Sequence, residues 1–468
     1  MQEIDEQNRD YAHRLFQCVA AASRPLRAEE LAEFLAFDFE AGSTPTFLAD
    51  WRSEDPENEV LSICSTLLVV VKPPSGSPVI QFAHFSVKEY LTSARLAETK
   101  DTISRFHVSM TTAHIVVSQA CLGVLLHLDE NITKDSLSVL PLAEYAAEHW
   151  ADHALFENVS PKVQVGMKRL FDPNKCHLSV WVWIYDPEDL QHRSYHSERP
   201  AEARATPLHY AAVFNMHDIA MFLIIEHSQD VNARGFDDKE TPLHVSSRLG
   251  HLEIARVLLE HGADRETRDK NDFSSLERAS IGGYLELVQM LLEYGANVNA
   301  WDMDRRTPLD LASRWKNPRV ILELLKHGAD VKAKNNTGKT PLHRAEVEEV
   351  AQILLEHGAD ANALDVWNQT PLHCVSEGGH VGAARVLLEH GVDVNARDAN
   401  NATPLHLASE GTYSKEKRLD IARLLLQNGS DIHARDDKGQ TPFMRATARK
   451  FHKMMDLLLE HGAEDHRV

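Results

Sequence analysis

The sequence predicts a mostly α-helical chain, built as a solenoid of about eight helix-pair repeats preceded by a smaller region of different architecture. Two observations support this fold class. A motif that begins with Thr-Pro-Leu-His recurs through the second half of the chain, most often at a spacing of 33 residues, and apolar residues between its copies follow helical spacing. Before residue 206 the motif is missing, and helical patterns alternate with two β-branched stretches.

Composition narrows the class of protein further. The 468 residues carry a formal net charge of −21, with −12 before residue 206 and −9 after it, so no basic surface for nucleic acid or anionic lipid is expected. The five cysteines are isolated, which argues against disulfides and cysteine zinc sites. The longest apolar stretch, 114–128, is shorter than a membrane span. We therefore expect a cytoplasmic protein, with a nuclear location left open, and no nucleic-acid partner.

Residues 1–100 predict three helices followed by a β-hairpin. The helices are expected at 8–22, 28–36 and 59–65, and the hairpin strands at 67–71 and 79–82, on either side of the turn sequence KPPSGSP. Three helices followed by a two-stranded wing is a winged-helix arrangement. DNA binding is disfavoured because the third helix, EVLSICS, has no Arg or Lys to reach phosphates or bases.

Residues 101–205 predict a helical linker region between the winged-helix domain and the repeats. Helices are expected at 87–96, which begins inside the preceding domain, and at 113–128, 142–156 and 163–171. Residues 186–205 predict an irregular connector. The domain boundaries are therefore expected near residues 100 and 205.

Each repeat carries two further signatures, LLEHGAD and VNAR or close variants, which together with TPLH identify ankyrin repeats over 206–468. The Thr caps the first helix and the Pro takes its first position. The second helix ends at Gly, as at Gly262, in the left-handed conformation. The histidines of TPLH and of EHG are expected to bond backbone groups and not to catalyse. One unit cannot bury its apolar face alone, so the array is stable only as a stack.

Two intervals depart from the 33-residue period. Three residues are missing between Thr340 and Thr370, and five are added between Thr403 and Thr441, around 412–417. Both changes are expected to fall in the loop between the two helices of a unit and to leave the packed faces unchanged. The first unit is irregular in sequence, as expected for a repeat that packs against a different domain.

Segments before the repeats resemble those of fungal NLR-like proteins of the NACHT/STAND type. These segments are RPLRAEELAEFL (24–35), FAHFSVKEYLTS (82–93), FHVSMTTAH (106–114), YAAEHWADHA (145–154) and WIYDP (183–187). Such proteins join a NACHT nucleotide-binding domain to a winged-helix region, which is named after a GPI inositol-deacylase, and often to ankyrin repeats. The resemblance implies nucleotide-gated sensing. The NACHT motif is absent from this sequence, so we expect it to correspond to the C-terminal portion of such a receptor.

No residue pattern indicates an enzyme, a cofactor or a metal. The only GKT sequence, Gly338-Lys339-Thr340, lacks the first glycine of a phosphate-binding loop and lies in a repeat. His149 and His153 are four apart on an expected helix but have no evident third ligand, which favours ordinary surface or helix-capping histidines. No G-x-S-x-G motif of a hydrolase is present.

The leading functional expectation is a non-enzymatic scaffold or sensor in signalling, which binds a protein partner through the concave surface of hairpin tips and first helices. The alternative is the C-terminal sensor half of a nucleotide-regulated fungal immune or incompatibility receptor. Acidic tips favour a partner patch with some basic character; they include Asp237, Asp238, Asp269, Asp272 and Asp365.

Aromatic and arginine side chains on that surface are the candidate contacts, because such residues dominate interface energetics. Some of the tip aromatics are alternatively expected to pack sideways on adjacent tips. The candidate partner-binding residues are Tyr210, Phe236, Phe273, Arg278, Trp301, Met303, Arg305, Arg306, Trp315, Arg344, Trp367 and Arg445.

Overall fold

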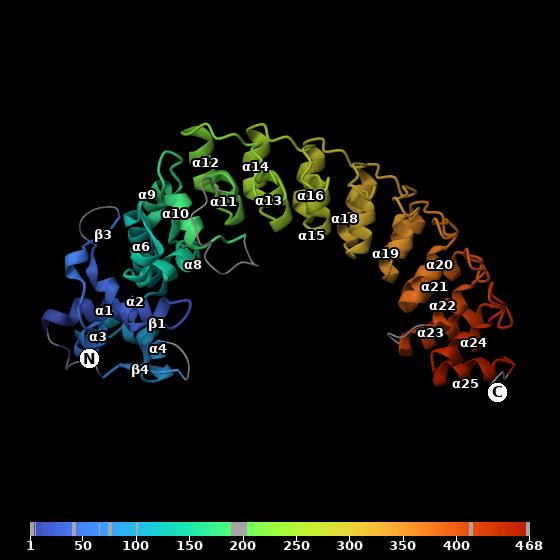
Figure 1. Cartoon of the computed structure of the whole chain (residues 1–468), viewed down its shortest axis with the longest axis horizontal. Coiled ribbons are helices and arrows are strands. Elements are labelled where there is room, and N and C mark those ends of the chain that lie inside the picture. Colours follow the sequence, from blue (N-terminus) through green and yellow to red (C-terminus); the bar gives the residue numbers. More distant parts are fainter. Residues whose placement is uncertain are drawn as a thin grey trace. The chain divides into compact units, whose positions relative to one another are not determined.

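The computed structural model describes residue 4 and residues 6–39, 44–64, 66–73, 77–99, 102–188, 204–410 and 415–464. The expected connector 186–205 lies mostly outside these residues, as does the middle of the KPPSGSP turn. Over the described residues the chain is mostly helical, as predicted, and forms two compact units, coloured from blue to green and from green to red in Figure 1. Unit 1 comprises Met1–Phe214 and Asp218–Gln229, and unit 2 comprises Asn215–His217 and Asp230–Val468.

Unit 1 begins with the predicted winged-helix arrangement. Its elements are η1 (Glu6–Asn8), α1 (Arg9–Ala21), β1 (Leu26–Arg27), α2 (Ala28–Glu33), η2 (Phe34–Ala36), β2 (Phe37–Asp38), β3 (Thr46–Phe47), η3 (Ala49–Trp51), α3 (Pro56–Cys64), β4 (Leu68–Val71) and β5 (Val79–Phe82). Strands β1, β5 and β4 form one antiparallel sheet in that order. The expected two-stranded wing therefore gains a third strand, in which Leu26 pairs with Ile80 and both side chains are buried.

Helices make up the rest of unit 1. They are α4 (Phe85–Leu91), α5 (Ala94–Ala97), η4 (Thr102–Phe106), α6 (Met110–His127), α7 (Lys134–Ser138), α8 (Leu142–Ala154), α9 (Ser160–Phe171) and α10 (His177–Ile184). The expectation of one helix over 87–96 is wrong. The hydroxyl of Ser93 accepts the N–H of Leu96 and starts a separate helix there, which ends the first helix at Leu91.

Helix α6 is the central helix of unit 1. It is long and apolar enough to cross a membrane by length and composition alone, which differs from the expectation drawn from the shorter stretch 114–128. Half of the helix is buried inside the protein, and it packs against α1, α8 and α9. A core helix passes the same length test, and this packing is that of a core helix.

The first repeat belongs to unit 1. Its helices are α11 (Pro207–Val213) and α12, which starts at His217 and continues to Ile225. Trp181 of α10 contacts the rings of Tyr210 and Phe214 at centroid distances of 5.9 and 5.8 Å, and it also meets Trp150 at 5.3 Å. This aromatic packing joins the first repeat to the helical region. The compact units therefore divide after Gln229, whereas the repeat motif begins at Thr206.

Unit 2 contains the other seven repeats, each a pair of helices beside the next pair (Figure 1). The pairs are α13 (Pro242–Leu249) with α14 (Leu252–Glu260), α15 (Ser275–Gly282) with α16 (Leu285–Glu293), α17 (Pro308–Arg314) with α18 (Pro318–Lys326), η5 (Pro341–Arg344) with α19 (Glu348–Glu356), α20 (Pro371–Gly378) with α21 (Val381–Glu389), α22 (Pro404–Glu410) with α23 (Lys415–Gln427), and α24 (Pro442–Ala448) with α25 (His452–Glu460). First helices pack on first helices and second on second, which buries the apolar face of each pair.

The structure confirms the helix start predicted at Thr-Pro and the helix end predicted at Gly in the repeats. The hydroxyl of Thr370 accepts the N–H of His373 at 3.4 Å, and Pro371 occupies the first helical position. Gly262 follows α14 with a φ of +87°, the left-handed conformation expected there.

The two length changes alter helices as well as loops. The three-residue deletion shortens the first helix of its repeat to the 3-10 turn η5, although Leu342 and Ala345 stay buried. The five-residue insertion lies partly outside the described residues, and its last residues extend α23 to 13 residues. The expectation that both changes are confined to the inter-helix loop is therefore wrong, whereas the packed face of η5 is kept.

Candidate protein-interaction surface

Six hairpins of unit 2 are each organised by a buried Asp or Asn near the base. The Oδ1 atom of Asp365 accepts the backbone N–H groups of Trp367 and Gln369, both at 2.8 Å. The same pattern recurs at Asp269, Asp302, Asn335, Asp398 and Asp436. These side chains satisfy hairpin amides that would otherwise lack partners. Asp269 and Asp365 are therefore structural and buried, and the expectation that they attract a basic partner patch is wrong for these two.

The TPLH histidines connect neighbouring repeats, as expected. In each, Nδ1 accepts the N–H of the capping Thr, so Nε2 carries the proton and donates to a carbonyl of the next hairpin. The four Nε2–O distances are 3.0 Å for His244 to Phe273, 3.0 Å for His343 to Gln369, 3.1 Å for His373 to Ala402 and 3.1 Å for His406 to Gln440. Burial lowers the pKa of all four imidazoles, to about 4 for His343.

The histidines that end the second helices also bond backbone carbonyls. Nδ1 of His261 lies 2.8 Å from the carbonyl oxygen of Val257, and His357, His390 and His461 repeat this contact four residues back. These rings satisfy carbonyls at the helix end that have no partner within the helix. The repeat histidines therefore belong to the scaffold.

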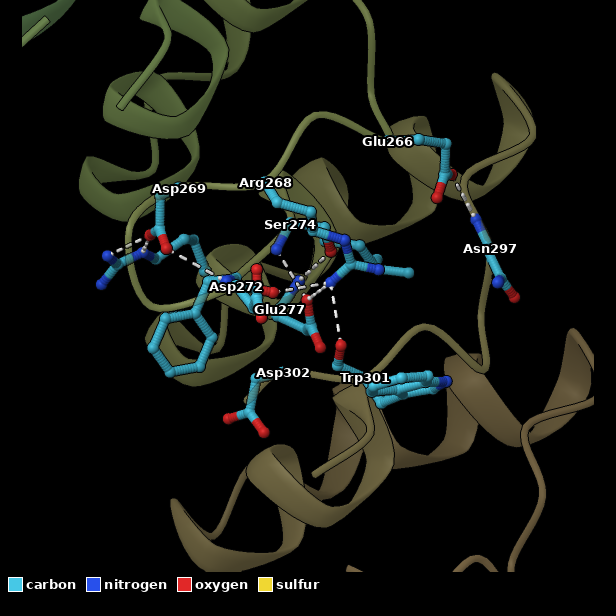
Figure 2. Close-up of polar contacts among 12 residues, drawn as sticks. Glu266, Arg268, Asp269, Asp272, Ser274, Glu277, Asn297, Trp301 and Asp302 are labelled. Atoms are coloured by element: carbon cyan, nitrogen blue, oxygen red, sulfur yellow. Dashed lines mark hydrogen bonds and ion pairs between the residues drawn. The ribbon is translucent and has the colours of Figure 1, made fainter. Parts of the chain in front are cut away.

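One repeat has Glu277 in place of the TPLH histidine (Figure 2). Its Oε2 accepts the backbone N–H of Ser274 at 2.6 Å and the guanidinium of Arg268 at 2.7 Å. Arg268 Nη1 also donates to the carbonyl oxygens of Asp272 and Trp301. Burial outweighs these donors and raises the pKa of Glu277 to about 7. The next repeat has Asp310 at this position, and burial raises the pKa of that carboxyl to about 6.

At the hairpin position of Arg268, several repeats have a basic residue whose side chain donates a hydrogen bond to a backbone carbonyl of the following hairpin. Arg268 donates to the carbonyl oxygen of Trp301 at 3.2 Å, Lys334 to that of Leu364 at 2.9 Å, and Arg397 to that of Arg435 at 2.9 Å. Two repeats have an apolar residue at this position, namely Trp301 and Leu364. Leu364 has no donor, and the Trp301 indole makes no hydrogen bond to the next hairpin among the described residues; both side chains are exposed to solvent.

Four of the predicted contact residues are held within the fold. Tyr210 is fully buried against Trp181, so the expectation that it is exposed on the surface is wrong. Arg278 pairs with Asp269, and Arg306 pairs with Asp302 at 2.7 Å. Arg445 pairs with Asp436 and with Glu410, at 2.7 and 2.8 Å. These ion pairs hold the three arginines against the fold, so little of each guanidinium is available to a partner.

Three predicted residues are partly covered. Phe236 is half-buried at a hairpin tip with a φ of +55°. Phe273 lies beneath the guanidinium groups of Arg278 and Arg306, at 4.7 and 5.8 Å, so it packs sideways as the alternative expectation had it. Arg344 is half-buried, and its charge favours the ionised form of Asp310.

The remaining predicted residues are exposed and come from three repeats. Trp301, Met303 and Arg305 lie on the hairpin 301–306, with the Arg305 guanidinium 5.4 Å from the centre of the Trp301 ring. Trp315 follows α17, and Trp367 lies on the hairpin 364–369. The exposed fractions of the apolar ones are 55% for Trp301, 57% for Met303, 57% for Trp315 and 49% for Trp367.

These residues have exposed neighbours that were not predicted from the sequence. Leu364 and Val366 are 45% and 59% exposed on the same hairpin as Trp367. Trp301, Arg305, Lys332 and Lys334 line a hollow of about 400 Å³ together with Asn299, Thr307, Asp330 and Ala333. Comparing equivalent hairpin positions between repeats would have revealed Leu364 and Val366, since most repeats have polar residues there.

The metal and phosphate candidates have other partners. His153 is buried rather than on the surface, with Nε2 at 2.8 Å from the Tyr145 hydroxyl and Nδ1 at 2.9 Å from His114, and burial lowers its pKa to about 3. His149 contacts Asp152 at 3.2 Å. In the sequence Gly338-Lys339-Thr340, the N–H of Lys339 donates to Asn335 and the Thr340 hydroxyl meets His343, so these residues form a repeat hairpin.

Comparison with known families agrees with this architecture. Overlapping matches to the family model for ankyrin repeats span residues 188–436, more than half of the chain. Residues 2–104 match the winged helix domain of GPI inositol-deacylase. The chain therefore belongs to the ankyrin-repeat family and carries a winged-helix domain at its N-terminal end. Ankyrin domains are typically interaction modules without catalytic activity.

Among curated proteins, the chain is 30% identical over 277 residues to the azaphilone pigments biosynthesis cluster protein L of Monascus ruber, which covers 56% of this chain and 57% of that protein. It is 36% identical over 92 residues to human palmitoyltransferase ZDHHC13, covering 20% of this chain and 15% of that one. The chain thus spans about half or less of these relatives.

Two solved structures align with 48% of this chain and with all of theirs. The ankyrin repeat domain of Bcl-3 aligns at 29% identity and a TM-score of 0.40, and the human ASB11 ankyrin repeat domain at 25% and 0.44.

Proposed function

We propose that this protein is a non-enzymatic scaffold or sensor that binds a protein partner through the surface of hairpin tips and first helices of unit 2. The observation that carries the proposal is a group of exposed aromatic and aliphatic side chains on two hairpins. At the equivalent hairpin positions, most other repeats have polar or bridging residues. Exposed tryptophans surrounded by polar neighbours are typical interface hot spots.

The scaffold around these residues supports binding because it is rigid. The hairpins are held by Asp–amide bonds within each repeat and by histidine and cation bridges between repeats. A surface ordered before association loses less conformational entropy when a partner binds.

Affinity capture with the whole chain tests this proposal. Wild type is compared with a variant that carries Trp301→Ala, Trp315→Ala and Trp367→Ala, with Tyr294→Ala on the end of a second helix as a control of similar exposure. We expect partners that are lost from the triple variant and retained by the control. Identical partner lists from wild type and the triple variant would contradict the proposed face.

A second candidate function is the sensor half of a nucleotide-regulated NLR-like receptor of fungi. The match of residues 2–104 to a winged-helix domain, joined to an ankyrin array, favours it. Sequencing of the full-length transcript tests it. A NACHT-encoding segment in the same reading frame supports this function, and a transcript that lacks one contradicts it.

A further inference from the structure

The hairpins 301–306, 334–339 and 364–369 follow one another in the stack, and the segment that contains the first two differs from the rest of the chain in charge. Residues 299–339 contain nine Lys or Arg and five Asp or Glu, a net charge of +4 in a chain of −21. A positive surface on an acidic protein attracts acidic partners.

Three cations that line the hollow beside Trp301 have no carboxylate partner among the described residues. Arg305, Lys332 and Lys334 are exposed, and none of the ion pairs among the described residues includes them. The nearby Asp330 is engaged, because its Oδ1 accepts the N–H of Lys332 at 2.9 Å. The hollow beside Trp301 is therefore lined by three cations and one carboxylate, and its lining carries a net positive charge.

Arg305 also occupies an unfavourable backbone position. Its φ is +57°, and the equivalent hairpin residues, which also have positive φ, are Lys239, Asp272, Gly338, Asn368, Asn401 and Gly439. Left-handed backbone conformation is easiest for Gly and Asn and is less favourable for a bulkier residue. The Arg305 guanidinium lies beside the exposed Trp301 ring, so the cation and the indole form one continuous surface.

Apolar residues lie on the outer two of the three hairpins. Trp301 and Leu364 replace the bridging cation, so they are exposed without contributing to the hydrogen bonds between repeats, and Met303, Val366 and Trp367 lie beside them. Two repeat steps of 8–10 Å separate the outer hairpins by about 20 Å, which an extended peptide spans with about six residues. The middle hairpin presents Lys334 and Asn336.

We propose that these three hairpins bind an extended acidic segment of a protein partner that has two apolar side chains about six residues apart. One apolar side chain packs beside Trp301 and Met303, and the other packs beside Leu364, Val366 and Trp367. The acidic residues between them face Arg305, Lys332 and Lys334. This inference rests on the proposed function and specifies its ligand chemistry.

The test uses the whole chain and a fluorescein-labelled synthetic peptide with two leucines six residues apart and glutamates between them. A second peptide has lysine in place of each glutamate. Fluorescence anisotropy is measured for wild type, Trp301→Gln and Arg305→Asn, with Leu322→Gln on α18 as the control of similar exposure. Asparagine already occupies the Arg305 position in two other hairpins, so this variant is expected to fold.

We expect saturable binding of the glutamate peptide, weakened at least fivefold by Trp301→Gln and by Arg305→Asn and unchanged by Leu322→Gln. No saturable binding, equal binding of the lysine peptide, or full affinity in either hairpin variant would overturn the inference. Loss of partners from the triple variant in affinity capture without peptide binding rejects this inference alone, whereas unchanged capture rejects the proposed function.

Discussion

The imidazole of His373 bonds to the carbonyl oxygen of Ala402 in the next hairpin, at 3.1 Å from Nε2. Its other nitrogen, Nδ1, accepts the N–H of Thr370 at 3.1 Å. The link therefore requires a neutral ring with its proton on Nε2, because a protonated Nδ1 would meet a second donor. Four repeats of unit 2 use this link, so its protonation state affects the whole array.

Acid is expected to weaken the array. Burial lowers the pKa of His343 to about 4, against 6.5 when unfolded, so between these values the unfolded chain binds more protons. The stabilisation by this histidine is complete above pH 6.5 and is lost as the pH falls towards 4. We predict a lower midpoint of urea unfolding, followed by circular dichroism, at pH 5 than at pH 7.

His343→Gln tests the same link directly. Glutamine can still donate to the carbonyl of Gln369, but it lacks the rigid ring that holds this bond and the bond from Thr340 together, so the variant is expected to cost about 1 kcal/mol at pH 7. It should also reduce the loss of stability between pH 7 and 5. His433→Gln, at an exposed position, is the control. A pH dependence that is the same in wild type and His343→Gln would contradict this explanation.

Glu277 has the opposite effect of pH. Burial raises its pKa to about 7, against 4.5 when unfolded, so the folded chain binds the extra proton between these values and stability falls as the pH rises from 4.5 to 7. Glu277→Gln removes this loss and is expected to stabilise the protein by up to about 3 kcal/mol at pH 8, with no gain at pH 4.5. Urea unfolding at both pH values measures it, and an equal gain at both would count against a buried charge as the cause.

Asp365→Ala is expected to loosen one hairpin. The substitution removes the acceptor for the N–H groups of Trp367 and Gln369 and should cost about 1–3 kcal/mol. Hydrogen exchange should accelerate at these two amides more than at amides of α25. Asp238→Ala, at an exposed hairpin position, serves as the control. Unchanged exchange at Trp367 in Asp365→Ala would show that the carboxylate does not hold the hairpin.

The division of the chain after Gln229 predicts how fragments behave. A fragment of residues 1–229 retains the contacts of Trp181 with Tyr210 and Phe214, whereas a fragment of residues 1–205 loses them. We expect the shorter fragment to melt at a lower temperature and to bind a hydrophobic dye. Equal melting temperatures would place the boundary at residue 205 instead.

Local chemistry made much of the fold predictable from the sequence. Helix starts at Thr-Pro, helix ends at Gly and the bridging histidines all depend on residues a few positions apart, and they recur often enough to be recognised. Tyr210 could not be placed in this way. Its burial comes from Trp181, which lies outside the repeats and has no counterpart in the other units.

The candidate surface was predictable only in part for a similar reason. The sequence alone does not show whether an arginine on a hairpin forms an ion pair. In the structure Arg278 and Arg306 pair with buried aspartates, whereas Arg305 has no ion pair among the described residues. The exposure of Trp301 was expected. That Trp301 occupies the position of a bridging cation follows only from the hydrogen bonds that Arg268 and Arg397 make at the equivalent positions.

The short turn η5 has a mechanical consequence for unit 2. Repeats in series carry the same tension, so an array that is pulled from its ends yields first at its weakest member. The four-residue η5 has only the hydrogen bonds of a single 3-10 turn, whereas the complete first helices have seven or eight residues. We expect extension to begin at this repeat, with the flanking blocks still folded. Because η5 follows the hairpin 334–339, a load on the array would distort the surface between Trp301 and Trp367 before the rest unfolds.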